Sequence, residues 1–123
     1  MNILLVEDDH EVAETLMGAF EMRSWEVHWS PSVAHARTKL ANRTAHGQGD
    51  HGFDLAIIDL NLPDGLGHDL LPLDFQAIMY SGLPDNAERG LKAKGIENVP
   101  VFSKGSPFAM FDYIEERAQT CES

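Results

Sequence analysis

The sequence predicts an α/β fold: a doubly wound, five-stranded parallel sheet with helices on both faces. Short apolar runs of β type alternate with segments whose apolar residues recur at helical spacing, which is typical of parallel strands joined by helical crossovers. The run 53–60 is apolar on both faces, as a doubly covered central strand requires. With 123 residues, 43% hydrophobic and 24% charged, residues 1–123 are expected to form a single domain.

The five predicted strands are short runs rich in aliphatic and aromatic residues. They cover residues 3–6, 25–29, 53–60, 76–80 and 99–102. The first is apolar throughout, and the second alternates apolar with polar residues, as in a half-exposed strand. The fourth ends at Ser81 and Gly82.

Five predicted helices alternate with these strands. They cover residues 10–23, a segment opening at Ser30, residues 66–74, residues 84–94 and a segment opening at Ser106. Ser30-Pro31 and Ser106-Pro107 each combine an N-cap serine with proline at the first helical position. Gly95 closes the fourth helix, the third stops near Pro72 after the turn Pro63-Asp64-Gly65, and residues 44–52 form a glycine-rich loop.

The charge and cysteine content exclude several classes of function. A net charge of −11 argues against general binding to nucleic acid and against docking on anionic lipid. The run 3–6 is followed at once by acids, so it resembles neither a signal peptide nor a membrane span. Cys121 cannot form an internal disulfide, which fits a reducing compartment. A cytoplasmic protein that binds neither nucleic acid nor membrane is expected.

Chemically complementary side chains follow four of the predicted strands. They are Glu7, Asp8 and Asp9 after the first strand, Asp59 and Asn61 at the third, Ser81 after the fourth and Lys104 after the fifth. Ligands of an open parallel sheet bind outside the carboxyl ends of the strands. Two carboxylates about 4 Å apart repel by roughly 4 kcal/mol at an effective dielectric near 20, so gathering them requires a cation. All-oxygen ligands select a hard divalent ion, and Mg²⁺ is the usual partner of phosphoryl chemistry.

Four motifs, covering essentially the whole chain in order and spacing, resemble the receiver domain of bacterial two-component response regulators. They are ILLVEDD, DLAIIDLNLPDG, MYSG and VFSKG. The resemblance implies a flavodoxin-like strand order, 2-1-3-4-5. It also implies a phosphoprotein that takes its phosphoryl group from a histidine kinase or a histidine phosphotransfer protein and signals by contact with a downstream protein. Such a receiver is not an enzyme for other substrates, because it catalyses only its own phosphorylation and dephosphorylation.

The resemblance assigns a role to each candidate residue. Asp59 is the phosphoacceptor, and Ser81 and Lys104 bind the phosphoryl oxygens. The Mg²⁺ site comprises Glu7, Asp8, Asp59 and Asn61. Within it, Asp8 is a direct ligand, Glu7 acts largely through water, and Asn61 offers its backbone carbonyl.

Two positions depart from the family pattern. Gly105 stands where the family usually has a cis proline after the lysine, and Val101 stands where it usually has a switch aromatic. Without that ring, we expect the response to phosphorylation to centre on residues 82–95. Gly90, inside the predicted helix, is expected to make that helix the least stable of the five.

Two other functions stay open at this point. The first is an interaction module that keeps the fold but works without phosphorylation, because both departures affect the switching apparatus. The second is a small phosphatase, since Asp59-Leu60-Asn61 resembles the motif of haloacid-dehalogenase-type phosphatases, although Asn61 cannot replace their second aspartate as a proton donor. Intact phosphorylation chemistry favours the receiver over both.

Two further groups of residues have weaker functional interpretations. His46, Asp50 and His51 offer possible zinc ligands on a glycine-rich loop, where solvated side chains are the more common outcome. Arg89, Lys92 and Lys94 lie on one predicted helix and form either a partner surface or a solvated face. The remaining histidines, His68 among them, are expected at the surface or at edges.

Overall fold

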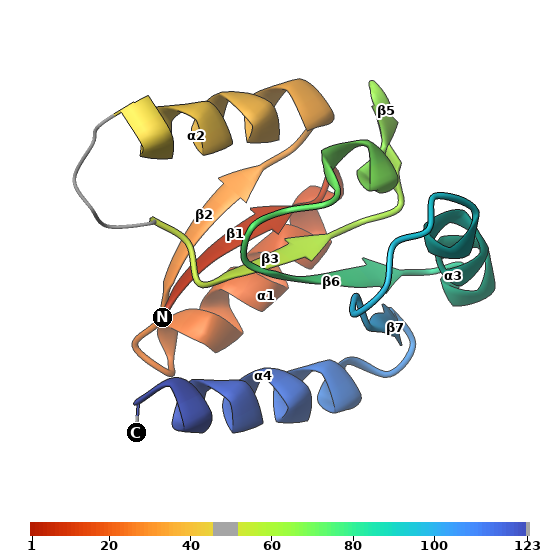
Figure 1. The fold of residues 1–123 in the computed structure, drawn as a ribbon. Helices are drawn as coiled ribbons and strands as arrows, with labels where there is room; N and C mark the ends of the chain where they lie inside the picture. Colours follow the sequence, from red (N-terminus) through yellow and green to blue (C-terminus); the bar gives the residue numbers. More distant parts are fainter. Residues whose placement is uncertain (46–51, 123) are drawn as a thin grey trace.

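Five parallel strands form the centre of the computed structural model, which describes residues 1–45 and 52–122 (Figure 1). The strands are β1 (Asn2–Val6), β2 (Glu26–Ser30), β3 (Leu55–Ile58), β6 (Gln76–Ser81) and β7 (Val101–Ser103). Their order in the sheet is β2-β1-β3-β6-β7, and every neighbouring pair is parallel. The predicted parallel sheet and its order 2-1-3-4-5, counted over these five strands, are confirmed.

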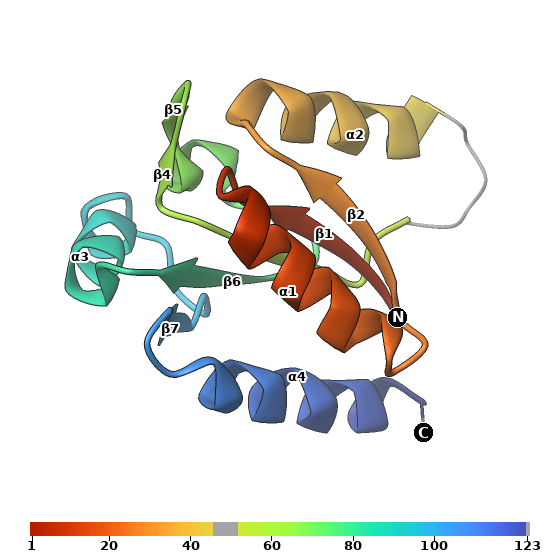
Figure 2. The same cartoon turned by 180° about the vertical axis from the view of Figure 1, so that it is seen from behind.

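Helices cover both faces of this sheet, as predicted (Figures 1 and 2). One face carries α1 (His10–Glu21) and α4 (Pro107–Glu122), and the other carries α2 (Val33–Ala45) and α3 (Pro84–Ala93). Strand β1 shows how the sequence builds two layers, because successive strand residues point to opposite faces. Ile3 and Leu5 pack in the core under α1 and α4, whereas Leu4 and Val6 pack in the core under α2 and α3.

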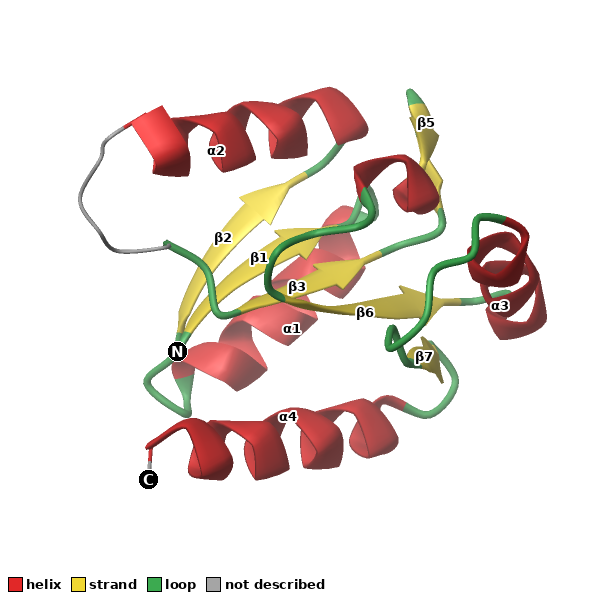
Figure 3. Ribbon diagram, in the orientation of Figure 1, coloured by secondary structure: helices red, strands yellow, loops and turns green. Residues whose placement is uncertain are grey.

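Only a 3-10 helix of four residues forms within the short helix predicted over residues 66–74, so that prediction was right only in part. The chain forms a small hairpin, β4 (Asn61–Leu62) and β5 (Gly65–Leu66), then a single 3-10 turn, η1 (Gly67–Leu70), and extended backbone (Figure 3). The Gly67 N–H donates to the backbone oxygen of Leu60 at 2.7 Å, and a Cβ on Gly67 would overlap the backbone oxygen of Asp59. This contact folds the segment back onto the end of β3, and Pro72 removes a backbone donor that a longer helix needs.

The second helix begins at Val33, and the prediction that Ser30 is its N-cap was wrong. Ser30 is the last residue of β2 and is buried. The carboxylate of Asp64, in the turn between β4 and β5, accepts the N–H groups of Val33 at 2.8 Å and Ala34 at 2.9 Å. The hydrogen bonds from Ala34 and Val33 hold the pKa of Asp64 below its usual value. The hydroxyl of Ser32 accepts the His35 N–H at 3.1 Å, so Ser32 is the local N-cap, and Asp64 binds the two preceding N–H groups from a distant part of the chain.

The C-terminal end of α3 and the start of α4 lie where the glycine and the Ser-Pro pair in the sequence predicted them. Gly95 has a φ of 69°, and its N–H donates to the Lys92 oxygen at 3.1 Å. The Ile96 N–H donates to the Leu91 oxygen at 2.9 Å, which completes a Schellman ending, and Ile96 packs against the core cluster that contains Leu91. Pro107 is the first residue of α4, as the Ser106-Pro107 pair predicted.

Candidate functional site

The carboxyl ends of β1, β3, β6 and β7 meet around one pocket of about 390 Å³. Its lining residues are Asp8, Asp9, Asp59, Asn61, Ser81, Gly82, Leu83 and Lys104. Five of the six predicted site residues are in this set. The sixth, Glu7, is enclosed beside Asp59 and Lys104 with 2% of its surface exposed.

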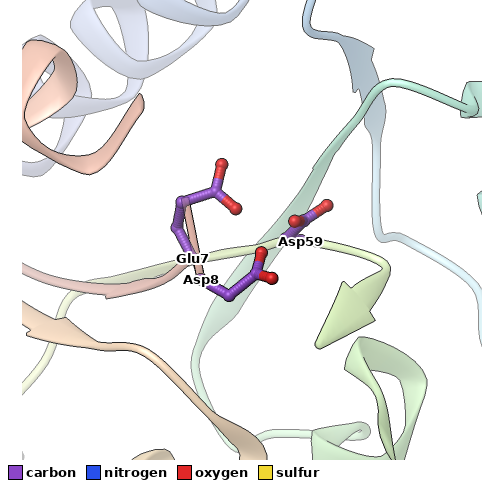
Figure 4. Close-up of side chains that lie close together, drawn as sticks. All are labelled: Glu7, Asp8 and Asp59. Carbon is purple, nitrogen blue, oxygen red and sulfur yellow. The ribbon is translucent and has the colours of Figure 1, made fainter. Parts of the chain in front are cut away.

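Three carboxylates form the acidic part of the site (Figure 4). Glu7, Asp8 and Asp59 each offer an oxygen within 4.8 Å of the others, and Figure 4 shows them converging from the ends of β1 and β3. Strand pairing explains this, because Val6 and Ile58 are register partners and the Asp59 N–H donates to the Val6 oxygen at 2.9 Å. Asp59 is 8% exposed, whereas Asp8 is open to solvent.

Lys104 supplies the positive charge of the site. Its Nζ lies 2.7 Å from Glu7 Oε1 and 3.2 Å from Asp59 Oδ2. Burial alone would lower the pKa of Lys104, but its bond to Glu7 and the charges of Asp59 and Glu7 raise it, so the ammonium stays charged. The expected pairing with Asp59 is observed although Gly105 follows the lysine in a trans peptide. The backbone holds this geometry through the Lys104 N–H, which donates to the Ser81 oxygen at 2.9 Å.

The buried carboxylate of Glu7 lacks well-directed hydrogen-bond donors in the described part of the chain. Neither of its carboxylate oxygens receives a well-directed hydrogen bond from the described residues, although the Lys104 ammonium lies close to one of them. Burial and the hydrogen bond of its protonated form to Asp59 raise the pKa of Glu7 to about 8, against the lowering effect of Lys104. A divalent cation would supply the missing charge, and the all-oxygen donor set suits a hard ion such as Mg²⁺.

The remaining polar residues of the pocket differ in their exposure and in the hydrogen bonds that they make. Ser81 is 1% exposed, and its hydroxyl accepts the Leu83 N–H at 2.9 Å, directly before α3. Asn61 is exposed at the start of β4. Asp9 caps α1, since its carboxylate accepts the N–H groups of Glu11 at 3.0 Å and Val12 at 3.3 Å. Asp9 therefore has a structural role at the pocket wall.

The usual switch position on β7 carries no ring. Val101 packs in the core shared with α3. Phe102 points to the opposite face, where its ring lies 5.4 Å from that of Tyr113 on α4. Tyr80 packs in that same opposite core. Both aromatic residues of this region are therefore on the side of the sheet away from α3.

Sequence reasoning missed two residues next to the site. His68, expected at the surface or an edge, is 3% exposed, and its Nε2 lies 3.0 Å from the Ala87 oxygen of α3. A glycine in the middle of the facing helix, Gly90, was the available signal, because it marks a close approach. Trp29 donates its indole N–H to the backbone oxygen of Glu7 at 2.7 Å.

The structure describes the basic residues predicted on one helix but not the possible zinc ligands. His46, Asp50 and His51 lie outside the described residues. Arg89 and Lys92 line a groove of about 610 Å³ between α3 and the chain leading into β7, while Lys94 pairs with Asp69 of η1 at 3.4 Å. Within the described residues, every helix is too short or too polar to cross a membrane.

Comparisons with known proteins give one partial sequence relative and many solved structures of the same fold. No family model matches the sequence. The swarming motility regulation protein RssB of Serratia marcescens is 42% identical over 67 residues, which are 54% of this chain and 27% of that protein. The match thus spans about a quarter of that curated relative.

Solved receiver domains have the same fold. The non-phosphorylated HemR receiver domain of Leptospira biflexa is 28% identical over 94% of this chain and 91% of its own, with a TM-score of 0.69. A CheY-like receiver domain from Methanospirillum hungatei is 23% identical over 98% and 95% of the two chains, and its TM-score of 0.74 shows the shared fold. The BeF3-activated receiver domain of Klebsiella pneumoniae RstA, 20% identical over 94% and 96%, also has a TM-score of 0.74. The fold is that of CheY-like receiver domains, and these likenesses support a receiver domain of the response-regulator type.

Proposed function

We propose that this receiver accepts a phosphoryl group on the carboxylate of Asp59, in the presence of Mg²⁺, from a histidine kinase or a histidine phosphotransfer protein. One observation carries the proposal: the Asp59 carboxylate faces the pocket between a half-buried ammonium and two further carboxylates. Phosphoryl transfer asks a protein mainly for positioning and for neutralisation of charge. This arrangement offers both.

Glu7, Asp8, Asp59 and the backbone carbonyl of Asn61 would hold the Mg²⁺ ion. When bound, the ion would neutralise negative charge on the transferring phosphoryl group. The burial of Glu7 supports this assignment, because its one close cation among the described residues, Lys104, is shared with Asp59, and two buried carboxylates around a single ammonium are costly unless a further positive charge compensates them.

The chain's own residues divide the remaining work. The Leu60 N–H donates to Asp59 Oδ1 at 2.8 Å and fixes the orientation of the carboxylate. A carboxylate oxygen of Asp59 forms the new O–P bond while the N–P bond of the donor phosphohistidine breaks and its imidazole leaves. Lys104 Nζ then pairs with one phosphoryl oxygen, and the Ser81 hydroxyl donates to another.

The same site would limit the lifetime of the signal. Attack of water on the phosphorus of the acyl phosphate would regenerate the free Asp59 carboxylate and release phosphate. The domain would therefore catalyse only its own phosphorylation and dephosphorylation. While phosphorylated, the domain would signal by contact with a downstream protein. The Ser81 hydroxyl accepts the Leu83 N–H and can at the same time donate its own hydrogen to a phosphoryl oxygen, so a movement of Ser81 toward the phosphoryl group would act first on the start of α3.

Intact-mass measurement tests the proposal. The protein is incubated with Mg²⁺ and acetyl phosphate, with Asp59→Asn as the test variant and Asp112→Asn, an exposed aspartate on α4, as the matched control. We expect a labile gain of one phosphate in the wild type and the control, dependent on Mg²⁺ and absent from Asp59→Asn. A wild type that gains no phosphate contradicts the proposal and favours a phosphorylation-independent module. Sustained hydrolysis of external phosphate monoesters contradicts it in favour of a phosphatase.

A further inference from the structure

The segment after Asp59 connects the pocket to α3 through one buried side chain. Residues 61–70 leave β3, form the β4–β5 hairpin and return in η1 against the end of the same strand (Figure 1). There the Gly67 N–H bonds to Leu60, and the absence of a side chain on Gly67 lets the backbone lie against that of Asp59. The residue after Gly67 is His68. A displacement of the Asp59 backbone therefore acts directly on the residue that precedes His68.

The His68 ring occupies the space that a side chain at Gly90 would need. A Cβ built on Gly90 would lie 2.7 Å from both ring nitrogens, closer than real Cβ atoms approach. The ring also lies 3.0 Å through Nε2 from the Ala87 oxygen, one turn earlier in α3. The backbone oxygen of His68 accepts a hydrogen bond from Lys94 Nζ at 3.2 Å, at the end of the same helix. His68 therefore contacts the middle of α3 and is tied to its end.

The first turn of α3 is tied to the pocket by a separate route. The Leu83 N–H is bonded to the Ser81 hydroxyl, and the Leu83 oxygen accepts the Ala87 N–H at 3.1 Å. Ala87 is thus the residue where the two routes meet, one from Ser81 and one from Asp59 through His68. Val101 faces this helix from β7, so the ring packed against α3 comes from η1.

We propose that His68 couples the state of the Asp59 pocket to the position of α3, on the face of the sheet to which β7 presents Val101 and no aromatic residue. This inference rests on the proposed phosphorylation of Asp59 and adds a residue that transmits it. The His68 ring and Gly90 interlock, and tightly packed contacts of this kind pass on a backbone shift instead of absorbing it. His68 is a positioning residue, because it touches neither the pocket nor the reacting atoms.

Amide hydrogen exchange on the full chain tests the coupling. The probe is Mg²⁺ with beryllofluoride, a phosphoryl mimic. Binding is followed by tryptophan fluorescence, since the Trp29 indole bonds to the backbone of Glu7. In the wild type we expect the probe to change exchange in residues 84–93 at least threefold. In His68→Ala we expect binding affinity to stay within threefold while the change in residues 84–93 falls below threefold.

Three variants sharpen the comparison. Lys94→Ala removes the pair with Asp69 and the bond to the His68 backbone oxygen but keeps the ring against Gly90 and Ala87, and His35→Ala removes a histidine from α2. Because the ring carries the proposed coupling, both variants should keep the response of α3 to the probe. His68→Leu fills much of the ring's volume without the contact to Ala87, so it should lose the response even if His68→Ala unfolds. A full response of α3 in His68→Leu or in folded His68→Ala, with the probe bound, overturns the coupling.

The resting protein separates failure of the coupling from failure of the proposed function. Without any probe, His68→Ala or His68→Leu should speed exchange in residues 87–93 at least tenfold relative to Lys94→Ala. Unchanged resting exchange overturns the role of His68 whether or not the probe binds. The remaining outcome is that the His68 variants show this resting difference while the wild type never binds the probe. That outcome contradicts phosphorylation at Asp59 but still supports the contact between η1 and α3.

Discussion

Replacing Gly90 by alanine should destabilise this protein, although glycine is a poor residue for the interior of a helix. Helix propensity alone would make Gly90→Ala more stable by about 1 kcal/mol. The new methyl group would meet both ring nitrogens of His68 at 2.7 Å, and the ring is buried against Ala87. Overpacking a filled site of this kind costs about 1–3 kcal/mol. We expect a net loss of about 1 kcal/mol in the free energy of unfolding.

Gly18→Ala is the matched control, because Gly18 is an exposed position inside α1 with no atom within 4 Å of the new Cβ. It should gain about 1 kcal/mol, so the same substitution at two helical glycines should differ by about 2 kcal/mol. Urea denaturation with an unchanged m-value measures both. In a His68→Ala background, Gly90→Ala should instead become stabilising by about 1 kcal/mol. A Gly90→Ala protein as stable as Gly18→Ala would refute the packing argument.

Three further predictions concern the site. Mg²⁺ at ten times its Kd should raise the free energy of unfolding by about 1.4 kcal/mol, and Asp8→Asn should lose most of that gain; a wild-type melt that ignores millimolar Mg²⁺ speaks against the metal site. In EDTA, the free energy of unfolding should fall from about pH 5 to pH 8, by at most about 1.4 kcal/mol per pH unit. The reason is that the pKa of Glu7 is about 8 in the fold against 4.5 as the ordinary value, so the folded chain holds the proton that the unfolded chain releases. Glu7→Gln should flatten this slope in urea titrations and the exposed Glu21→Gln should not; equal slopes in all three proteins would show that Glu7 is not the group. Lys104→Ala should slow phosphorylation by acetyl phosphate roughly 10- to 100-fold while cooperative unfolding is retained, and an unchanged rate in quenched time courses would remove Lys104 from the chemistry.

The layers of the fold were predictable because local patterns carry them. Alternating short apolar runs and helical periodicities predict the parallel sheet, and the double-faced apolar run predicts the central position of β3. The start of α2 was predicted at the wrong serine, since Ser32 is the local cap and the first two N–H groups bind the distant carboxylate of Asp64. The reduction of the third helix to the 3-10 turn η1 has a similar cause. Residues 66–70 are held by the contact between Gly67 and the end of β3, which overrides their helical pattern.

The composition of the pocket was predictable from one topological rule. Parallel strands end at the same edge of a sheet, so residues at four strand ends were expected to converge, and they do. The rule cannot assign individual contacts, which depend on side-chain packing. It did not separate Asp9, which caps α1, from its neighbours, and it did not predict that Lys104 lies closer to Glu7 than to Asp59.

Gly90 illustrates how a correct observation received an incomplete explanation. From the sequence it indicates a weak helix, because glycine lowers helix stability. The structure shows that it also leaves room for the His68 ring, a partner 22 residues earlier in the chain. Propensity is a local property, whereas this contact depends on how η1 and α3 pack. Only the folded arrangement relates the two residues.

The most direct test of the central claim locates the phosphoryl group chemically. Borohydride reduces an acyl phosphate to an alcohol, so treating the phosphorylated protein with borohydride and mapping its peptides by mass spectrometry identifies the modified carboxylate. We expect homoserine at position 59, dependent on both Mg²⁺ and acetyl phosphate, with Glu7 and Asp8 unmodified. Reduction at another carboxylate, or a phosphate that resists borohydride and maps to Ser81 or to a histidine, would contradict the assignment of Asp59 as the phosphoacceptor.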